Sequence, residues 1–104
     1  MQFQPRQFPR VSLATEVTVR CHDESIFTAT GVEIGAGGMA LESANRLGVA
    51  QPIQVSFSLR PGRPLTLQAV VWWKRGNLVG VRFDPADTNR QHVQQWVEEQ
   101  KKLD

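Results

Sequence analysis

The stretch VEIGAGGMAL, residues 32–41, has the pattern of two strands that meet at a glycine turn. Large apolar residues lie at both of its ends, and Gly35, Gly37 and Gly38 interrupt it. Glycine weakens the interior of a strand and is typical of a bulge or a sharp turn. We therefore expect one strand to end near residue 34 and another to begin at Met39.

Alternating apolar and polar residues predict further strands on both sides of this turn. Upstream, residues 16–22 place Val17, Val19 and Cys21 on one face, and residues 26–34 form a second extended run. Downstream there are three more runs, at residues 53–59, 65–74 and 78–83. About six strands with closely spaced turns predict an all-β barrel or sandwich.

The end of the chain changes period from two to that of a helix. Apolar residues recur there at i, i+3 and i+4, as Val93, Trp96 and Val97. Asp87 or Thr88 can cap the N-terminus of this segment. The pattern predicts an amphipathic helix over residues 89–102, laid against the barrel.

Length and composition predict one domain of 104 residues: an N-terminal arm (1–14), a barrel (15–84) and the helix. The net charge of +2 is too small to favour nucleic acid as a partner. We find no apolar run long enough to span a membrane. The single cysteine, Cys21, excludes an internal disulfide and is typical of a reducing cytoplasm.

Two arginines in the N-terminal arm, Arg6 and Arg10, have the spacing R-x-x-x-R. Pro5 and Pro9 precede them, so we expect an extended arm with restricted backbone freedom. Guanidinium groups match phosphate oxygens and the O6/N7 edge of guanine. The arginines could therefore clamp a compact dinucleotide, or they could be solvated or paired with surface carboxylates.

Together, the arginine pair and the later E-x-G-x-x-G segment resemble the PilZ family of bacterial cyclic-di-GMP receptors. In that family an R-x-x-x-R arm precedes a barrel that carries a D/N-x-S-x-x-G turn. The resemblance implies a six-stranded antiparallel β-barrel with a C-terminal α-helix packed on it. It also implies cyclic-di-GMP as the ligand, bound by Arg6, Arg10, Glu33, Gly35 and Gly38.

Two positions depart from the family's pattern. Glu33 keeps a carboxylate but is one methylene longer than Asp, so it could still accept guanine N–H donors. Gly35 stands where the family has a serine and carries no hydroxyl. Losing one neutral hydrogen bond costs about 0.5–1.5 kcal/mol. The departures predict weakened or absent ligand binding and no change of fold.

Other chemistries are poorly supported by the residues. The glycine run lacks the Lys-Ser/Thr of a phosphate-binding loop. His22 and His92 have no partners at metal-ligand spacing, and we find no recognisable nucleophile. The sequence therefore predicts neither an enzyme nor a metal site, and no cofactor.

Trp72 and Trp73 are adjacent in a predicted strand. Because successive strand residues face opposite sides, we expect one ring in the core and one outside. The outer ring could contact a protein partner or stack on a base.

Three functions remain open at this point. The favoured one is a non-catalytic receptor that binds cyclic-di-GMP and regulates a partner in trans. The second is a degenerate adaptor that recognises a protein without the nucleotide. The third, a barrel that binds single-stranded nucleic acid, is least favoured because the net charge is low.

Overall fold

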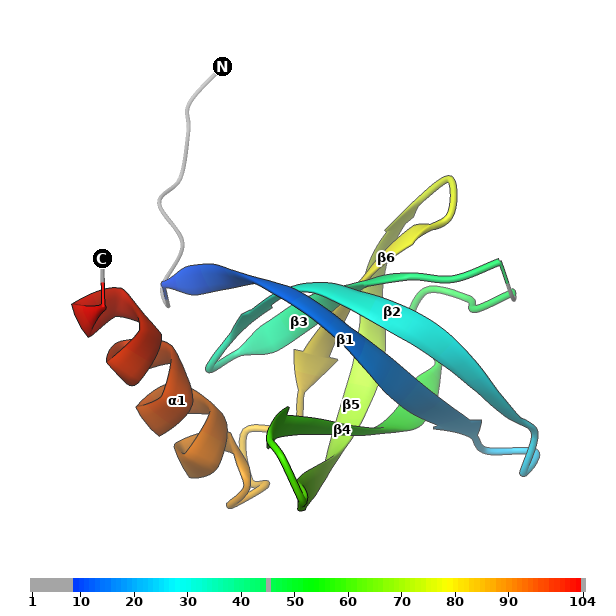
Figure 1. Cartoon of the computed structure of the whole chain (residues 1–104). Coiled ribbons are helices and arrows are strands. Elements are labelled where there is room, and N and C mark those ends of the chain that lie inside the picture. The colour runs from blue at the N-terminus through cyan, green and yellow to red at the C-terminus, as the bar shows by residue number, and fades with distance from the viewer. Residues whose placement is uncertain (1–8, 45, 104) are drawn as a thin grey trace.

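The computed structural model describes residues 9–44 and 46–103. In this part of the chain six strands form a closed antiparallel barrel in the order β1-β2-β3-β6-β5-β4, with one helix beside it (Figure 1). The elements are β1 (Arg10–Cys21), β2 (Ile26–Gly35), β3 (Gly38–Glu42), β4 (Pro52–Arg60), β5 (Arg63–Arg75), β6 (Leu78–Phe83) and α1 (Arg90–Lys102). The predicted six-stranded barrel with a C-terminal helix is confirmed.

The first strand begins earlier than the sequence analysis predicted. We expected an arm over residues 1–14, but β1 already pairs with β2 at Arg10, opposite Gly35. Val11 and Leu13 are partly buried and pack against the core, so burial of their side chains extends the strand toward the N-terminus. Arg10 is therefore a strand residue, while Arg6 lies outside the described residues.

The core consists of inward-facing side chains from all six strands and α1. One row of paired residues runs through it across five neighbouring strands: Val11, Ile34, Met39, Val81 and Val71. The residues on either side of each member therefore face outward. Gly35 and Gly38, at the ends of β2 and β3 that meet at the glycine turn, thus lie on the outer side, next to this inner row.

Helix α1 lies across the end of the barrel at which β1 begins (Figure 1). Its Val93 and Val97 are buried, and Trp96 packs against the core. An ion pair between Arg60 and Glu99, with N–O 2.6 Å, joins the helix to the end of β4. No helix in the described part of the chain is long and apolar enough to span a membrane.

The start of α1 differs by one residue from the prediction. Asn89 is the N-cap and makes no side-chain capping bond. Asp87, which we expected as a possible cap, instead accepts a hydrogen bond from the Asn89 amide through Oδ1, at 3.0 Å. Its Oδ2 accepts another from the Gln68 amide of β5, at 3.0 Å, so Asp87 joins the helix start to the barrel.

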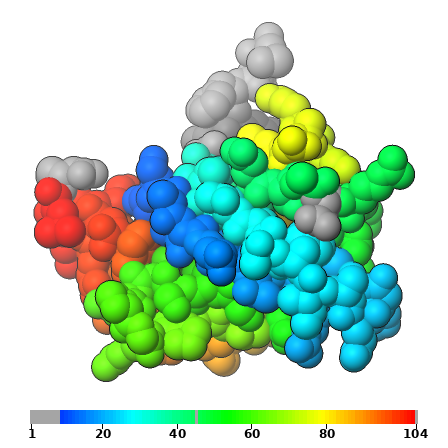
Figure 2. Space-filling view, turned by 45° about the vertical axis from the view of Figure 1, so that its right-hand side comes forward, coloured from blue at the N-terminus to red at the C-terminus, as the bar shows by residue number. Residues whose placement is uncertain are grey.

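The space-filling view shows β1 and β2 side by side, with α1 at the edge of this face (Figure 2).

Candidate functional site

One line of paired residues crosses the outside of four neighbouring strands. Arg10 of β1 pairs with Gly35 of β2, Gly35 pairs with Gly38 of β3, and Gly38 pairs with Arg82 of β6. Residues paired across antiparallel strands project from the same face of the sheet. One arginine therefore stands at each end of a pair of glycines.

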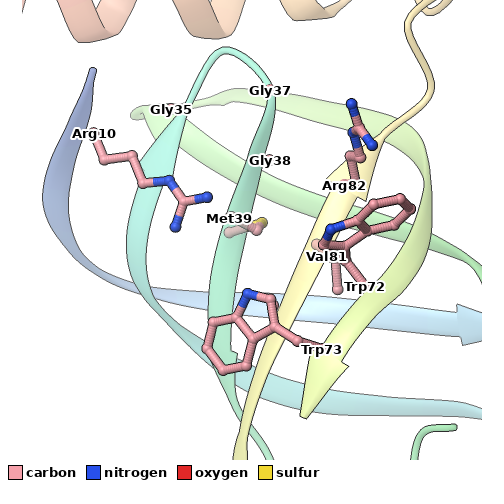
Figure 3. Close-up of a pocket in the computed structure, with 10 residues that line it drawn as sticks. Arg10, Gly35, Gly37, Gly38, Met39, Trp72, Trp73, Val81 and Arg82 are labelled. Carbon is pink, nitrogen blue, oxygen red and sulfur yellow. The ribbon is translucent and has the colours of Figure 1, made fainter. Parts of the chain in front are cut away.

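A second outer line runs beside the first and has two small residues, Ala40 and Gly80, at its centre. Glu33 of β2 pairs with Ala40 of β3, Ala40 with Gly80 of β6, and Gly80 with Trp73 of β5. A groove of about 190 Å³ lies over the first line and over the Gly80–Trp73 end of the second, with glycines on much of its floor (Figure 3). Arg10 lies on one side of this groove, and Trp72, Trp73 and Arg82 lie on the other (Figure 3).

Arg10 forms an ion pair with Glu33 on the neighbouring strand. The distance between Nη1 and Oε1 is 3.1 Å, and the two side chains are 29% and 32% exposed. An exposed ion pair contributes about 0–1 kcal/mol to stability, so this one orients the guanidinium without holding it strongly. The sequence analysis left two roles open for Arg10, pairing with a surface carboxylate and binding a ligand. In the structure Arg10 does pair with a carboxylate, and that carboxylate belongs to Glu33, another predicted ligand residue.

Gly35 is required because the main chain at Pro9, just before β1, passes close to it. A β-carbon on Gly35 would lie 2.6 Å from the carbonyl oxygen of Pro9 and 3.1 Å from Cγ of Arg10. Real β-carbon contacts are not this short, so a side chain here would displace the backbone at Pro9. The missing hydroxyl therefore has a steric reason: the main chain occupies the space that a serine would fill.

Gly38 is also a site of close approach between two strands. A β-carbon on Gly38 would overlap the carbonyl oxygen of Val81 and lie 3.2 Å from Cα of Arg82. The positive-φ glycines in the described residues are Gly62 and Gly76, so Gly38 is not in the left-handed region. Its role in this structure is to let β3 and β6 approach each other closely.

The prediction that one of the two adjacent tryptophans lies in the core is wrong. The pairing of β5 with β6 shifts register between Val71 and Trp73, which is a β-bulge. An extra residue in a bulge interrupts the alternation of faces. As a result Trp73 lies half-buried over Gly80, where regular alternation would turn it into the core. Trp72 follows the inward-facing Val71 and is 58% exposed, with the guanidinium carbon of Arg82 4.5 Å from its ring centroid.

Arg90, the first residue of α1, contacts the glycine turn from the helix side. Its Nε donates to the carbonyl oxygen of Ala36 and its Nη1 to that of Pro85, each at 3.1 Å. The amide of Phe83 donates to the carbonyl oxygen of Gly37 at 2.9 Å. The turn between β2 and β3 is thus connected to both β6 and α1.

The structure brings together four of the five predicted site residues: Arg10, Glu33, Gly35 and Gly38. The fifth, Arg6, lies outside the described range. The sequence analysis missed Arg82 and Arg90. Arg82 lies on the polar side of its strand, two residues after Gly80, but its position beside Gly38 depends on β6 pairing with β3. No local pattern predicts that pairing.

Metal ligation has no support in residues 9–44 and 46–103, which contain no group of three or more His, Cys, Asp or Glu side chains able to hold an ion. Hydrogen bonds from the hydroxyl and the amide of Ser25 lower the pKa of the Asp23 carboxyl in the β1–β2 turn. That turn lies apart from the groove, whose lining offers charged and hydrogen-bonding groups.

Comparison with known protein families identifies the fold. The model of the PilZ domain matches residues 4–99, which is almost the whole chain. The chain belongs to the PilZ domain family. No curated protein sequence matches it significantly.

Solved PilZ domains and related structures share this fold at low sequence identity. The Bacillus subtilis inhibitor of motility, MotI/DgrA, has a TM-score of 0.79 at 18% identity over 97% of this chain and 53% of its own. The PilZ domain of Escherichia coli YcgR, solved with c-di-GMP, has a TM-score of 0.76 at 15% identity, covering 96% and 94%. A PilZ domain of CeSA from a cellulose-synthesizing bacterium has a TM-score of 0.73 at 20% identity, covering 89% and 98%. This PilZ chain thus spans about half the length of the motility inhibitor and nearly all of the two isolated domains.

Proposed function

We propose that this PilZ domain is a non-catalytic receptor that binds cyclic-di-GMP in the groove over Gly35 and Gly38 and so regulates a partner protein in trans. The observation that carries the proposal is the line Arg10–Gly35–Gly38–Arg82, which places guanidinium groups at both ends of a floor without side chains. The solved complex of the YcgR domain with c-di-GMP supports the choice of ligand. A bacterial cytoplasm, where Cys21 stays reduced, is the expected compartment.

In this proposal the charged residues divide the ligand between them. Arg10 donates to a phosphate or to the O6/N7 edge of guanine, because its planar fork matches both. Glu33 accepts from guanine N–H groups, as its place in the family motif implies. Arg6 completes the arginine pair from outside the described residues. Because Glu33 already contacts Arg10 at 3.1 Å, the ligand competes with this ion pair or shares it.

The size of the groove limits how much of the ligand it encloses. Its volume of about 190 Å³ is below the roughly 300–1,000 Å³ of typical small-molecule sites. A single base can lie in it, while the rest of a cyclic dinucleotide extends over the rim. We therefore expect affinity to depend on the groups along the rim, which are arginines and a tryptophan.

Calorimetric titration of cyclic-di-GMP tests the proposal. We expect binding to the wild type and a loss of more than about 100-fold in the Arg6→Ala/Arg10→Ala variant, since each charge-assisted bond contributes about 1.5–3 kcal/mol. Arg20→Ala is the matched control, because Arg20 lies on the same strand, exposed and away from the groove. Absence of binding to folded wild type, or equal binding to the double variant, contradicts the proposal.

A protein-binding adaptor is the second candidate, and three observations favour it. The carbonyl oxygen of Pro9 fills the space of a side chain at Gly35, and the Arg10 guanidinium is engaged by Glu33. A larger hollow of about 620 Å³ also lies next to Trp72, lined mainly by apolar residues that include Val70 and Phe83. An adaptor would capture the same partner with or without Arg6 and Arg10. Loss of capture in the double alanine variant would argue against it.

A further inference from the structure

Trp72 is an aromatic side chain held on the surface by its neighbours. Within the described residues the exposed large apolar side chains are Ile26, Val49, Trp72 and Leu103, and Trp72 alone among them is aromatic. Its ring faces outward because Trp72 directly follows the inward-facing Val71 in β5, and the guanidinium carbon of Arg82 lies 4.5 Å from the ring centroid. A cation–π contact of this kind fixes the ring's orientation. The ring is therefore presented in a defined orientation instead of turning freely.

This pair stands directly across the groove from Arg10. Arg82 pairs with Gly38, Gly38 with Gly35, and Gly35 with Arg10, so three strand spacings separate the two arginines. At about 4.8 Å per spacing, their backbones are roughly 14 Å apart. Figure 3 shows the Arg10 side chain extending toward the centre of the groove from one side, with Trp72 and Arg82 on the other. Long side chains on both walls can therefore contact one flat group lying between them.

From this geometry we propose that Trp72 and Arg82 form a stacking platform for a guanine base of the cyclic dinucleotide. The inference rests on the proposed function and adds a binding wall outside the R-x-x-x-R and E-x-G-x-x-G segments. The base lies over the small residues of the floor, contacts the Trp72–Arg82 pair with its π-face, and presents its edge to Arg10 and Glu33. The Arg82 guanidinium has N–H donors that can bond a phosphate while it remains beside the ring.

The charge of the walls favours a nucleotide over a protein side chain as the occupant. Arginine stands on both sides of the groove, at Arg10 and Arg82, and the floor is built from Gly35, Gly38 and Gly80. Basic groups beside an aromatic ring are the usual elements of a surface that stacks bases and contacts phosphates. Trp72 and Arg82 also line the larger apolar hollow on their other side, where a protein could contact them instead. The experiments separate these two uses.

Affinity measurements with cyclic-di-GMP are the first test. We expect Trp72→Ala to bind about 5- to 150-fold more weakly than wild type, the range found when a base-stacking aromatic is truncated. Trp72→Phe keeps a π-face and should remain within about threefold of wild type. Val49→Ala truncates a side chain of similar exposure, 62%, outside the groove and should have no effect. Circular dichroism confirms that each variant is folded.

Fluorescence identifies which ring meets the base. The chain has three tryptophans, so Trp73→Phe/Trp96→Phe leaves Trp72 as the only one, and Trp72→Phe/Trp96→Phe leaves Trp73. Saturating ligand should quench Trp72 emission more strongly than Trp73 emission, because Trp73 is packed against Gly80. A structural role of Trp72 alone would not produce ligand-dependent quenching.

The outcomes distinguish this inference from the proposed function. If folded wild type binds no cyclic-di-GMP, both are wrong. If wild type binds and the Arg6→Ala/Arg10→Ala variant does not, yet Trp72→Ala binds as tightly as wild type and Trp72 emission is unchanged, only the stacking platform is wrong. Weaker binding by Trp72→Ala, rescue by Trp72→Phe and quenching of Trp72 together support it.

Discussion

A β-carbon on Gly35 would lie 2.6 Å from the carbonyl oxygen of Pro9. The chain that leads into β1 therefore passes against the last residue of β2, at the point where Arg10 pairs with Gly35. This contact sets the position of the Arg10 backbone over the glycine turn. Replacing the glycine affects both the strand pairing and the predicted ligand site.

Gly35→Ser would restore the family's serine, but we predict that it neither stabilises the domain nor improves binding. The added atoms displace the backbone at Pro9, and overpacking of this kind costs about 1–3 kcal/mol. Denaturant unfolding measures the loss. Gly48→Ser is the control, because the nearest atom to a β-carbon there is Oε1 of Gln51 at 3.9 Å. A Gly35→Ser variant as stable as wild type, with tighter ligand binding, would show that Pro9 moves away easily.

Glu33→Gln should bind cyclic-di-GMP more weakly than wild type. The amide offers guanine N–H groups one neutral oxygen in place of a charged carboxylate, although it also removes the ion pair with Arg10 that competes with the ligand. A hydrogen bond to a charged group contributes about 1.5–3 kcal/mol and a neutral one about 1 kcal/mol, whereas the partly exposed pair is worth up to about 1 kcal/mol, so we expect a net loss of up to about tenfold. Calorimetry measures the change, with Glu16→Gln on the exposed side of β1 as a control. Tighter binding would mean that the ion pair with Arg10 opposes the ligand more than the charge of Glu33 helps it.

Gly80→Ala should displace the Trp73 ring, because a β-carbon at residue 80 overlaps the indole. We expect a loss of about 1–3 kcal/mol in unfolding free energy and a red shift of tryptophan emission. A double-mutant cycle with Trp73→Ala tests the cause. If the clash accounts for the loss, Gly80→Ala costs much less in the Trp73→Ala background. Additive effects would contradict this explanation.

Arg90→Met should loosen the glycine turn while keeping most of the side chain's length. The variant loses the hydrogen bonds to the carbonyl oxygens of Ala36 and Pro85. Because the donor is charged, we expect a loss of about 1–2 kcal/mol. Hydrogen exchange should be faster at Gly37 and Gly38. Arg75→Met, at the exposed end of β5, is the control. Equal exchange rates at Gly37 and Gly38 in both variants would show that Arg90 does not connect α1 to the turn.

The barrel was predictable because its strands alternate regularly and its helix has a different period. Even the early start of β1 had a signal, since Val11 and Leu13 continue the alternation of apolar residues. The bulge at Trp72 had none, because the prediction of one inward and one outward ring assumes an uninterrupted ladder. The sequence alone could not show that the strand register is shifted there.

The candidate site was only partly predictable for a similar reason. Arg10 and Glu33 were recognised through their motifs, but that they pair with each other depends on the register of β1 and β2. Arg82 was missed because it reaches Gly38 through a pairing of strands distant in the sequence. The sequence shows that residue 35 has no hydroxyl, but it does not show that the Pro9 carbonyl lies where a side chain would be.

The most direct test of the central claim is to follow backbone amide NMR signals while cyclic-di-GMP is added to the labelled domain. A ligand in the groove should shift signals of Arg10, residues 33–38, Trp72 and residues 80–82, and leave the β1–β2 turn at residues 23–25 unchanged. That result would place the nucleotide over the glycine floor between Arg10 and Arg82. Signals that stay unchanged at saturating ligand, or shifts concentrated away from these residues, would contradict the account.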